Sequence, residues 1–240
     1  MGETLDLSNS GLTALAADVW QRRDLTELNL YLNRLSAVPP EIGRLASLEI
    51  LILANNRLTH LPEEFGNFLH LRALDLGHNQ LAELPQSFGR LTGLSDYLYL
   101  HDNRLRTLAD SLFEKFGKLR YLNLGDNPLR ELPPSLASLT SLEELRLENI
   151  GLETLSDWIG SLSQLDELAL RNNNLSALPE SLAGLDRLRR FDLRGNQFQD
   201  APPVLATLSQ LQKLDLRWNK VPWASTVVAE LRGRGCRVLL

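Results

Sequence analysis

The stretch "RALDLGHNQLAELPQSF", residues 72–88, decides the fold because two periodicities meet in it. Its first half alternates leucine with other residues, which is typical of a short strand with one buried face. Its second half is too short for a helix with two loops, and its proline at position 85 favours a tight turn or a 3₁₀ segment. The stretch therefore predicts a strand followed by a turn.

The same pattern recurs along nearly the whole chain. Successive copies lie 23 residues apart, with one interval of 25, and a partial copy over 5–24 brings the total to about ten. They begin at Leu25, Leu48, Leu71, Leu94, Leu119, Leu142, Leu165, Leu188 and Leu211. One copy alone cannot bury its leucines, whereas stacked copies share a continuous core and a parallel sheet. We expect about ten short strands, with helix sparse except near 224–233.

This pattern, L-x-x-L-x-L-x-x-N-x-L-x-x-L-P-x-x-L-x-x-L-x-x, resembles the leucine-rich-repeat family. Its length and its "LP" are similar to intracellular Ras-suppressor and LAP-type scaffolds and to bacterial cytosolic leucine-rich-repeat proteins. The resemblance implies an α/β solenoid, a right-handed horseshoe with a parallel concave sheet and short 3₁₀ or turn segments on the convex side. We expect one domain over 1–240, with a first partial repeat in 1–24, regular repeats in 25–210, and the last repeat with a C-terminal cap in 211–240.

The ninth position of the pattern is asparagine in eight copies. Here the chain turns inward after the strand, and an amide can satisfy buried backbone donors and acceptors from one copy to the next. In the family this column is an asparagine ladder, and its members here are Asn33, Asn56, Asn79, Asn103, Asn127, Asn173, Asn196 and Asn219. Ser10 and Ile150 occupy the same position in two other copies.

Ile150 cannot join such a column, which leaves two interpretations open. One is a tolerated local defect, for which replacement by Asn would be neutral or stabilising. The other is a deliberate change in bend or a flexible point. A destabilising replacement would mean that Ile150 fills an apolar hole made by a rearranged turn. The 25-residue copy is a second irregularity, because "LSDYLYL" has one extra residue, which suggests a bulge, and Ala109 replaces the recurring proline.

Composition and charge limit the classes of partner and compartment that we expect for this chain. The chain has 240 residues with a net charge of −5, which argues against nucleic-acid binding by the chain as a whole. Cys236 is the only cysteine, so no internal disulfide forms, which fits a reducing compartment. Neither a signal peptide nor a membrane span is evident. We expect a cytoplasmic protein with no membrane partner, and secretion without a cleavable signal, as for an effector, stays open.

The sequence offers no motif for chemistry. It lacks a Gly-rich phosphate loop, a C-x-x-C pair and a serine nucleophile elbow, and Cys236 has no nucleophile motif around it. His78 and His101 fall on adjacent copies, where a metal site is conceivable, but exposed histidine on a polar face is the ordinary outcome. We therefore predict no catalytic residue, cofactor or metal.

The outward strand positions carry the candidate binding residues. The N-terminal half presents aromatic and apolar side chains of the kind that protein interfaces favour. The C-terminal half presents arginines alternating with acidic residues, which either pair with one another or meet acidic groups of a partner. Residues 185–240 hold ten Lys or Arg against five Asp or Glu. The candidates are Tyr31, Ile50, Ile52, Tyr99, His101, Tyr121, Arg146, Arg171, Arg194, Arg217 and Trp218.

Three functional hypotheses follow. The first is a non-catalytic scaffold that binds another protein on its concave face. The second is the substrate-recognition part of a larger effector or enzyme, for example of the bacterial ubiquitin-ligase type, whose catalytic domain lies outside this chain. The third, an artificial consensus design, is disfavoured by Ile150 and the 25-residue copy. Since no capping element precedes Leu5, self-association through the N-terminal edge is a further prediction.

Overall fold

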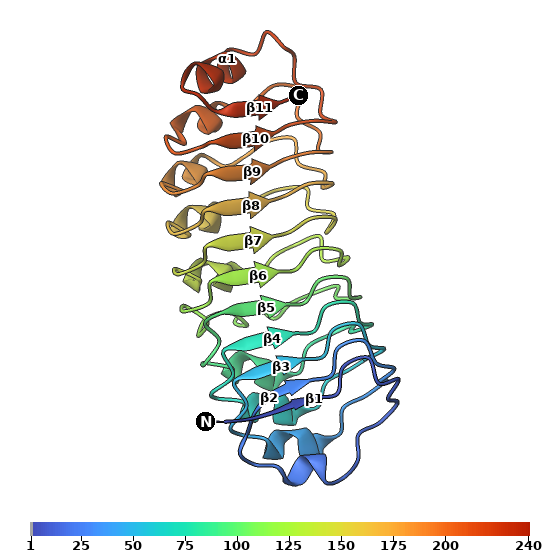
Figure 1. The fold of residues 1–240 in the computed structure, drawn as a ribbon. Coiled ribbons are helices and arrows are strands. Elements are labelled where there is room, and N and C mark those ends of the chain that lie inside the picture. Colours follow the sequence, from blue (N-terminus) through green and yellow to red (C-terminus); the bar gives the residue numbers. More distant parts are fainter. Residues whose placement is uncertain (1) are drawn as a thin grey trace.

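The computed structural model describes residues 2–240, in which eleven strands form one parallel sheet in chain order (Figure 1). Each strand pairs with the next along the chain, so the sheet grows by one strand per coil. The strands are β1 (Glu3–Asp6), β2 (Leu25–Asn29), β3 (Ile50–Ile52), β4 (Ala73–Asp75), β5 (Tyr97–Tyr99), β6 (Tyr121–Asn123), β7 (Glu144–Arg146), β8 (Glu167–Ala169), β9 (Arg190–Asp192), β10 (Lys213–Asp215) and β11 (Arg237–Leu239).

Strand register follows the sequence repeat. Leu51 of β3 is the register partner of Leu28 in β2 and of Leu74 in β4, and all three are fully buried. Their neighbours along each strand point to the other face, because side chains alternate in a strand. The predicted α/β solenoid with a parallel sheet is confirmed. It has one strand more than the approximate ten that the sequence predicts.

Short 3₁₀ helices form a second column beside the sheet (Figure 1). Six of the eight begin directly after a proline of the repeat, whose fixed φ suits the entry to such a turn. They span Val19–Gln21, Pro40–Arg44, Glu63–Asn67, Gln86–Arg90, Pro134–Ser138, Asp157–Ser161, Glu180–Gly184 and Pro203–Thr207.

The 25-residue copy forms hydrogen-bonded turns over 110–115 instead of a 3₁₀ helix. Missing proline is not the cause, because the helix Asp157–Ser161 forms after Ser156. This segment also has one residue more than the matching segments of the other copies. The other additional residue lies ahead of β5, whose pairs with β4 and β6 run without a register shift. The bulge suggested by the sequence is therefore not inside the paired strand.

The two ends of the solenoid differ. At the C-terminal end α1 (Thr226–Gly233) buries Val228 and Leu231, and β11 then adds the last strand. The predicted helix and final strand are confirmed. At the N-terminal end Leu5 and Leu7 pack against the core but stay partly exposed. At eight residues α1 is the longest helix of residues 2–240, and none there has the length and apolar character to cross a bilayer.

The eight predicted asparagines form a hydrogen-bonding column between coils, which Ile150 interrupts once between Asn127 and Asn173. Asn79 illustrates the geometry: its Nδ2 donates to the Leu53 and Leu76 carbonyls, each at 3.0 Å, and its Oδ1 accepts from the Leu58 N–H at 3.0 Å. Each asparagine thus joins its own coil to the preceding one. Equivalent bonds are made by Asn33, Asn56, Asn103, Asn127, Asn173, Asn196 and Asn219.

Ile150 belongs to the hydrophobic core, where its side chain is 1% exposed. The backbone around it is rearranged rather than left unpaired. The Leu129 N–H, which an asparagine at 150 would bind, donates to the Asn127 carbonyl at 2.9 Å. The Ile150 N–H donates to Asn173 Oδ1 at 3.2 Å, as Ser10 does to Asn33 in the first coil. This geometry favours the apolar hole made by a rearranged turn.

We therefore expect Ile150→Asn to lower the free energy of unfolding. Its amide would enter an apolar site where the nearest donor is already engaged, at a cost of about 1–3 kcal/mol. Ile150→Val, which removes one methylene without adding a polar group, should cost about 1 kcal/mol. Urea unfolding followed by circular dichroism measures both variants. A stabilised Ile150→Asn would restore the tolerated-defect interpretation.

Candidate functional site

Side chains that point away from the core form the candidate site, which we call the sheet face. It comprises the first and third residues of β3–β10 together with the residue two positions after each third residue. Because the registers are continuous, equivalent positions of neighbouring coils stack into columns. Of the predicted candidates, Tyr99 lies on β5 and Tyr121 lies on β6. His101 lies in the turn after β5, and Tyr31 lies after β2.

Three tyrosines and a histidine gather in the middle of the sheet face. The rings of Tyr97 and Tyr99 stack with centroids 4.7 Å apart, and the His101 ring meets Tyr99 edge-on at 6.1 Å. Tyr121, on the neighbouring strand, lies under the Arg120 guanidinium and donates a hydrogen bond to Glu143 Oε2 at 3.3 Å. We call Tyr97, Tyr99, His101 and Tyr121 the aromatic cluster. These half-buried rings are held by strands, so they lose little freedom when a partner binds.

A hollow of about 240 Å³ opens beside the aromatic cluster. Tyr99, His101 and Tyr121 line one part of it, and Leu122, Asn123, Glu144 and Arg146 line the rest. Tyr97 is absent from the sequence-based candidates, although it occupies the same strand position as Ile50 and Tyr121. The alternation in "YLY" was the signal that could have found it.

The remaining candidates of the N-terminal half lie apart from the cluster. Ile50 and Ile52 are on β3, two strands away from β5, and are partly exposed. Tyr31 is 42% exposed one coil further. Ile50 and Ile52 extend the sheet face with apolar surface, Tyr31 lies just outside it, and none of the three lines the hollow.

The predicted arginines of the C-terminal half pair with carboxylates of this chain. Arg217 Nη2 lies 2.7 Å from Asp215 Oδ2, and Arg194 Nε lies 2.9 Å from Asp192 Oδ1. Arg146 and Arg171 approach Glu148 at 3.7 and 3.9 Å. The geometry supports the self-pairing interpretation for Arg146, which also donates a hydrogen bond to Glu144, and for Arg194 and Arg217. The Nε of Arg171 has no hydrogen-bond partner among residues 2–240.

Two aromatic side chains project at the C-terminal end. Trp218 is 70% exposed at a positive φ of 64°, and the guanidinium groups of Arg194 and Arg217 lie 5.9 and 5.8 Å from the centroid of its ring. Trp223, which the sequence candidates omit, is 75% exposed and stacks under Arg232 at 4.8 Å. Both rings therefore present apolar surface beside positive charge.

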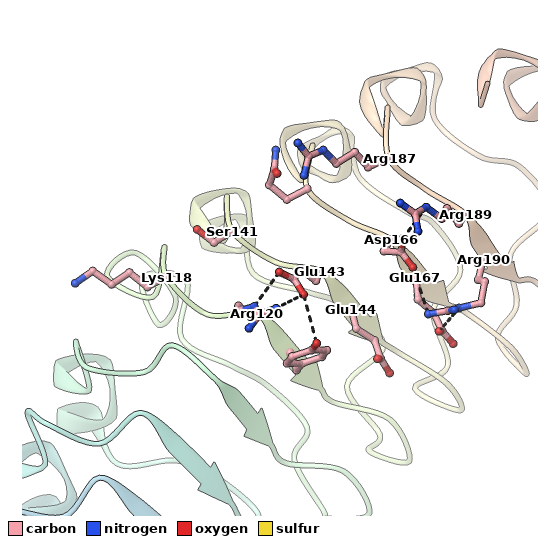
Figure 2. A pocket seen from close by; sticks show the side chains of 12 residues that line it. Lys118, Arg120, Ser141, Glu143, Glu144, Asp166, Glu167, Arg187, Arg189 and Arg190 are labelled. Atoms are coloured by element: carbon pink, nitrogen blue, oxygen red, sulfur yellow. Dashed lines mark hydrogen bonds and ion pairs between the residues drawn. The ribbon is translucent and has the colours of Figure 1, made fainter. Parts of the chain in front are cut away.

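A polar groove of about 660 Å³ runs along the edge of the sheet where β6–β9 begin (Figure 2). Arg120 binds Glu143 through two hydrogen bonds of 2.8 Å, and Arg189 and Arg190 both approach Asp166 at 3.2 Å. The hydrogen bonding from Arg120 is the largest cause that keeps the pKa of the Glu143 carboxyl below its usual value. The groove offers alternating charges but no pairing of a nucleophile with a base.

The family comparison covers this whole array. Residues 101–222 match the family model described as "Leucine-rich repeat region", and residues 3–58 and 46–96 match the model "Leucine rich repeat". The chain belongs to the leucine-rich-repeat family. No curated protein sequence matches it significantly.

Several leucine-rich-repeat structures are similar to this one. A leucine-rich-repeat protein of Leptospira interrogans shares 31% identity over 98% of this chain and 65% of its own, with a TM-score of 0.89. A TDR receptor shares 25% identity over 90% and 39%, with a TM-score of 0.80. The ectodomain of the Arabidopsis thaliana receptor kinase GASSHO1/SCHENGEN3, solved with CASPARIAN STRIP INTEGRITY FACTOR 2, shares 29% over 86% and 31%, with a TM-score of 0.61. The chain thus spans less than two thirds of each.

Leucine-rich-repeat folds are generally protein-interaction modules and are typically non-catalytic. Here the candidates for chemistry are sparse. Within residues 2–240 there is no group of three or more His, Cys, Asp or Glu side chains suited to a metal ion. Cys236 is buried, and burial raises the pKa of its thiol, which disfavours the reactive thiolate.

Two buried carboxyl groups of this leucine-rich-repeat face behave in opposite ways. Burial raises the pKa of Glu148, because its arginine neighbours lie beyond hydrogen-bond distance. Burial acts on Asp215 in the same direction, but hydrogen bonds from the Arg217 side chain and backbone outweigh it and lower the pKa of Asp215. Close donors, rather than nearby charge alone, decide the outcome.

Glu148→Gln is expected to stabilise the protein at pH 7. The pKa of Glu148 is raised in the folded state, so the folded protein binds the carboxyl proton more tightly than the unfolded chain does. Ionisation of Glu148 therefore costs stability as the pH rises above the pKa of this carboxyl in the unfolded state. The gain in melting temperature should therefore be largest at neutral pH and disappear near or below about pH 4, where both states are protonated. Melts from pH 4 to 8 measure it, with exposed Glu153→Gln as the control. A pH-independent difference would contradict the assignment.

Proposed function

We propose that this chain is a non-catalytic module that binds another protein through its sheet face, with the aromatic cluster at the centre of the interface. The observation that carries the proposal is the set of strand-held tyrosines around a hollow that also contains Arg146. Tyrosine and arginine are enriched among the residues that dominate interface energies. The general role of leucine-rich-repeat folds and the ligand-bound plant ectodomain support this use.

The charged columns take a different part in the proposed interface. Arg194 and Arg217 are already engaged by Asp192 and Asp215, so a partner gains little by pairing with them again. Such residues at the periphery of an interface change association rate and salt dependence more than affinity. We assign the energetic centre to the aromatic cluster and the orienting role to the arginine columns.

The test is affinity capture with two baits. The 240-residue chain serves as one, and the same chain carrying Tyr99→Ala and Tyr121→Ala serves as the other. A partner that binds the sheet face is enriched by the first bait and lost from the second, while both baits melt at similar temperatures. Partners retained equally by both baits would overturn the assignment of the sheet face.

A second candidate is the recognition part of a larger effector or enzyme. It is supported by the partial coverage of the similar structures, which extend well beyond the matched region. Sequencing the complete reading frame distinguishes the two, because a contiguous catalytic domain would favour the second candidate. The predicted self-association through the N-terminal edge stays a prediction that sedimentation of the chain would test.

A further inference from the structure

His78 and His101 face each other across neighbouring coils. His78 follows β4 in a left-handed backbone conformation, with φ of 54°, and His101 follows β5. Their rings meet edge-on with centroids 4.7 Å apart, and their Nε2 atoms lie 3.3 Å from each other. Two nitrogens at this separation either share one proton or direct both lone pairs at a common cation. With zinc–nitrogen bonds of about 2.1 Å, the separation gives an angle of about 105° at the ion, close to tetrahedral.

The groups around the two rings orient them so that both Nε2 lone pairs point at a common cation. Nδ1 of His78 lies 2.6 Å from Asp102 Oδ2, so a proton on Nδ1 is bound by the carboxylate and Nε2 keeps its lone pair. A carboxylate behind a histidine is the usual support of a ligating imidazole. In His101, Nδ1 is buried and has no hydrogen-bond partner among residues 2–240, which leaves Nε2 as the nitrogen that a ligand can reach.

The absence of a side chain at Gly77 leaves the space that the His101 ring occupies. A Cβ at this position would lie 2.3 Å from Cε1 of His101, so any side chain would displace the imidazole. The missing side chain therefore allows His101 to lie flat enough to approach His78. Three separate features, the facing Nε2 atoms, the Asp102 carboxylate and the space over Gly77, serve one geometry.

We propose that His78 and His101 bind one divalent transition-metal ion, Zn²⁺, Ni²⁺ or Cu²⁺, through their Nε2 atoms. Imidazole is a preferred ligand of all three ions. Since residues 2–240 contain no set of three or more suitable ligands, water fills the remaining positions and the ion exchanges readily. The general order of stability for such ligands makes Cu²⁺ the tightest of the three. This site shares His101 with the aromatic cluster, but ion binding is measured without a partner, so its test does not depend on the proposed partner-binding function.

The experiment is a Zn²⁺ titration of the 240-residue chain, observed through the histidine Cε1–H signals by NMR and through heat by calorimetry. The signals of His78 and His101 should move together and saturate, while those of His60 and His70 stay in place. His78→Gln and His101→Gln should each weaken binding by roughly tenfold or more, because one of two ligands is lost. His70→Gln, an exposed histidine outside the pair, is the matched control and should bind as the unchanged chain does.

Two results would overturn the site. One is the absence of any saturable change up to on the order of 1 mM Zn²⁺, which would leave the contact as a simple hydrogen bond. The other is an equal response of all four histidines, or equal weakening by His70→Gln, which would indicate nonspecific binding. Circular dichroism of each variant confirms that the substitutions leave the fold intact.

Discussion

Asn127→Ala is expected to lower the free energy of unfolding by at least about 3 kcal/mol. The Asn127 side chain is 1% exposed, so water cannot replace its bonds. Its Oδ1 accepts from the Leu105 N–H at 3.1 Å, and its Nδ2 donates to the carbonyls of Leu100, Leu124 and Gly125 at 2.9, 3.0 and 3.1 Å. Removing the amide leaves several buried backbone groups short of a partner, each costing about 1–3 kcal/mol, and adds a small cavity.

The position along the ladder provides a graded control. Asn219 makes the same kinds of bonds, but it is partly exposed at the last coil, so water can substitute. Asn219→Ala should therefore cost less than Asn127→Ala, and Asn174→Ala, at an exposed position outside the column, should cost least. Urea unfolding measures all three. If Asn127→Ala costs less than about 1 kcal/mol, the ladder is not what holds these turns.

Tyr99→Ala is expected to weaken partner binding by at least about 2 kcal/mol, which is about 30-fold in the dissociation constant. Tyr99 stacks on Tyr97, touches His101 and lines the hollow, so its removal opens the centre of the proposed interface. Its strand position keeps the ring in place before binding, which limits the entropy lost on association. Calorimetry or surface binding with the captured partner measures the change.

Two further variants separate the roles of the surfaces. Arg194→Ala should alter the association rate and its salt dependence with a smaller change in affinity, because Asp192 already binds this guanidinium. Gln86→Ala, exposed in the 3₁₀ helix Gln86–Arg90, is the control away from the sheet face. The proposal fails if Gln86→Ala weakens binding most while Tyr99→Ala binds and melts normally.

The repeat allows much of this fold to be predicted from sequence, because each coil solves the same burial problem. The L-x-L letters place Leu28, Leu51 and Leu74 in the core, and the recurring prolines precede most of the 3₁₀ helices. The column of asparagines follows for the same reason. Similarity to the Ras-suppressor and LAP-type scaffolds stays a prediction, since the matched models identify the family and not that class.

Features that depend on departures from the repeat were harder to predict. The pattern alone predicts that Ile150→Asn is neutral or stabilising, because the sequence cannot show that the Leu129 N–H turns to the Asn127 carbonyl. The burial of Glu148 likewise depends on side chains of neighbouring coils. Most other copies carry a different residue at the position of Glu148. The facing Nε2 atoms of His78 and His101 arise from ring orientation, which a repeat pattern specifies only to the level of adjacent coils.

The interruption at Ile150 also has a mechanical consequence. Each ladder asparagine binds the coil before it, so the junction between the Asn127 and Ile150 coils is the one within the ladder that lacks this side-chain link among residues 2–240. In a linear array whose coils contact mainly their neighbours, stability is a sum over junctions. Pulled apart by its ends, the solenoid should therefore part at this junction more easily than at the linked junctions beside it, yielding two shorter segments that each keep their own ladder.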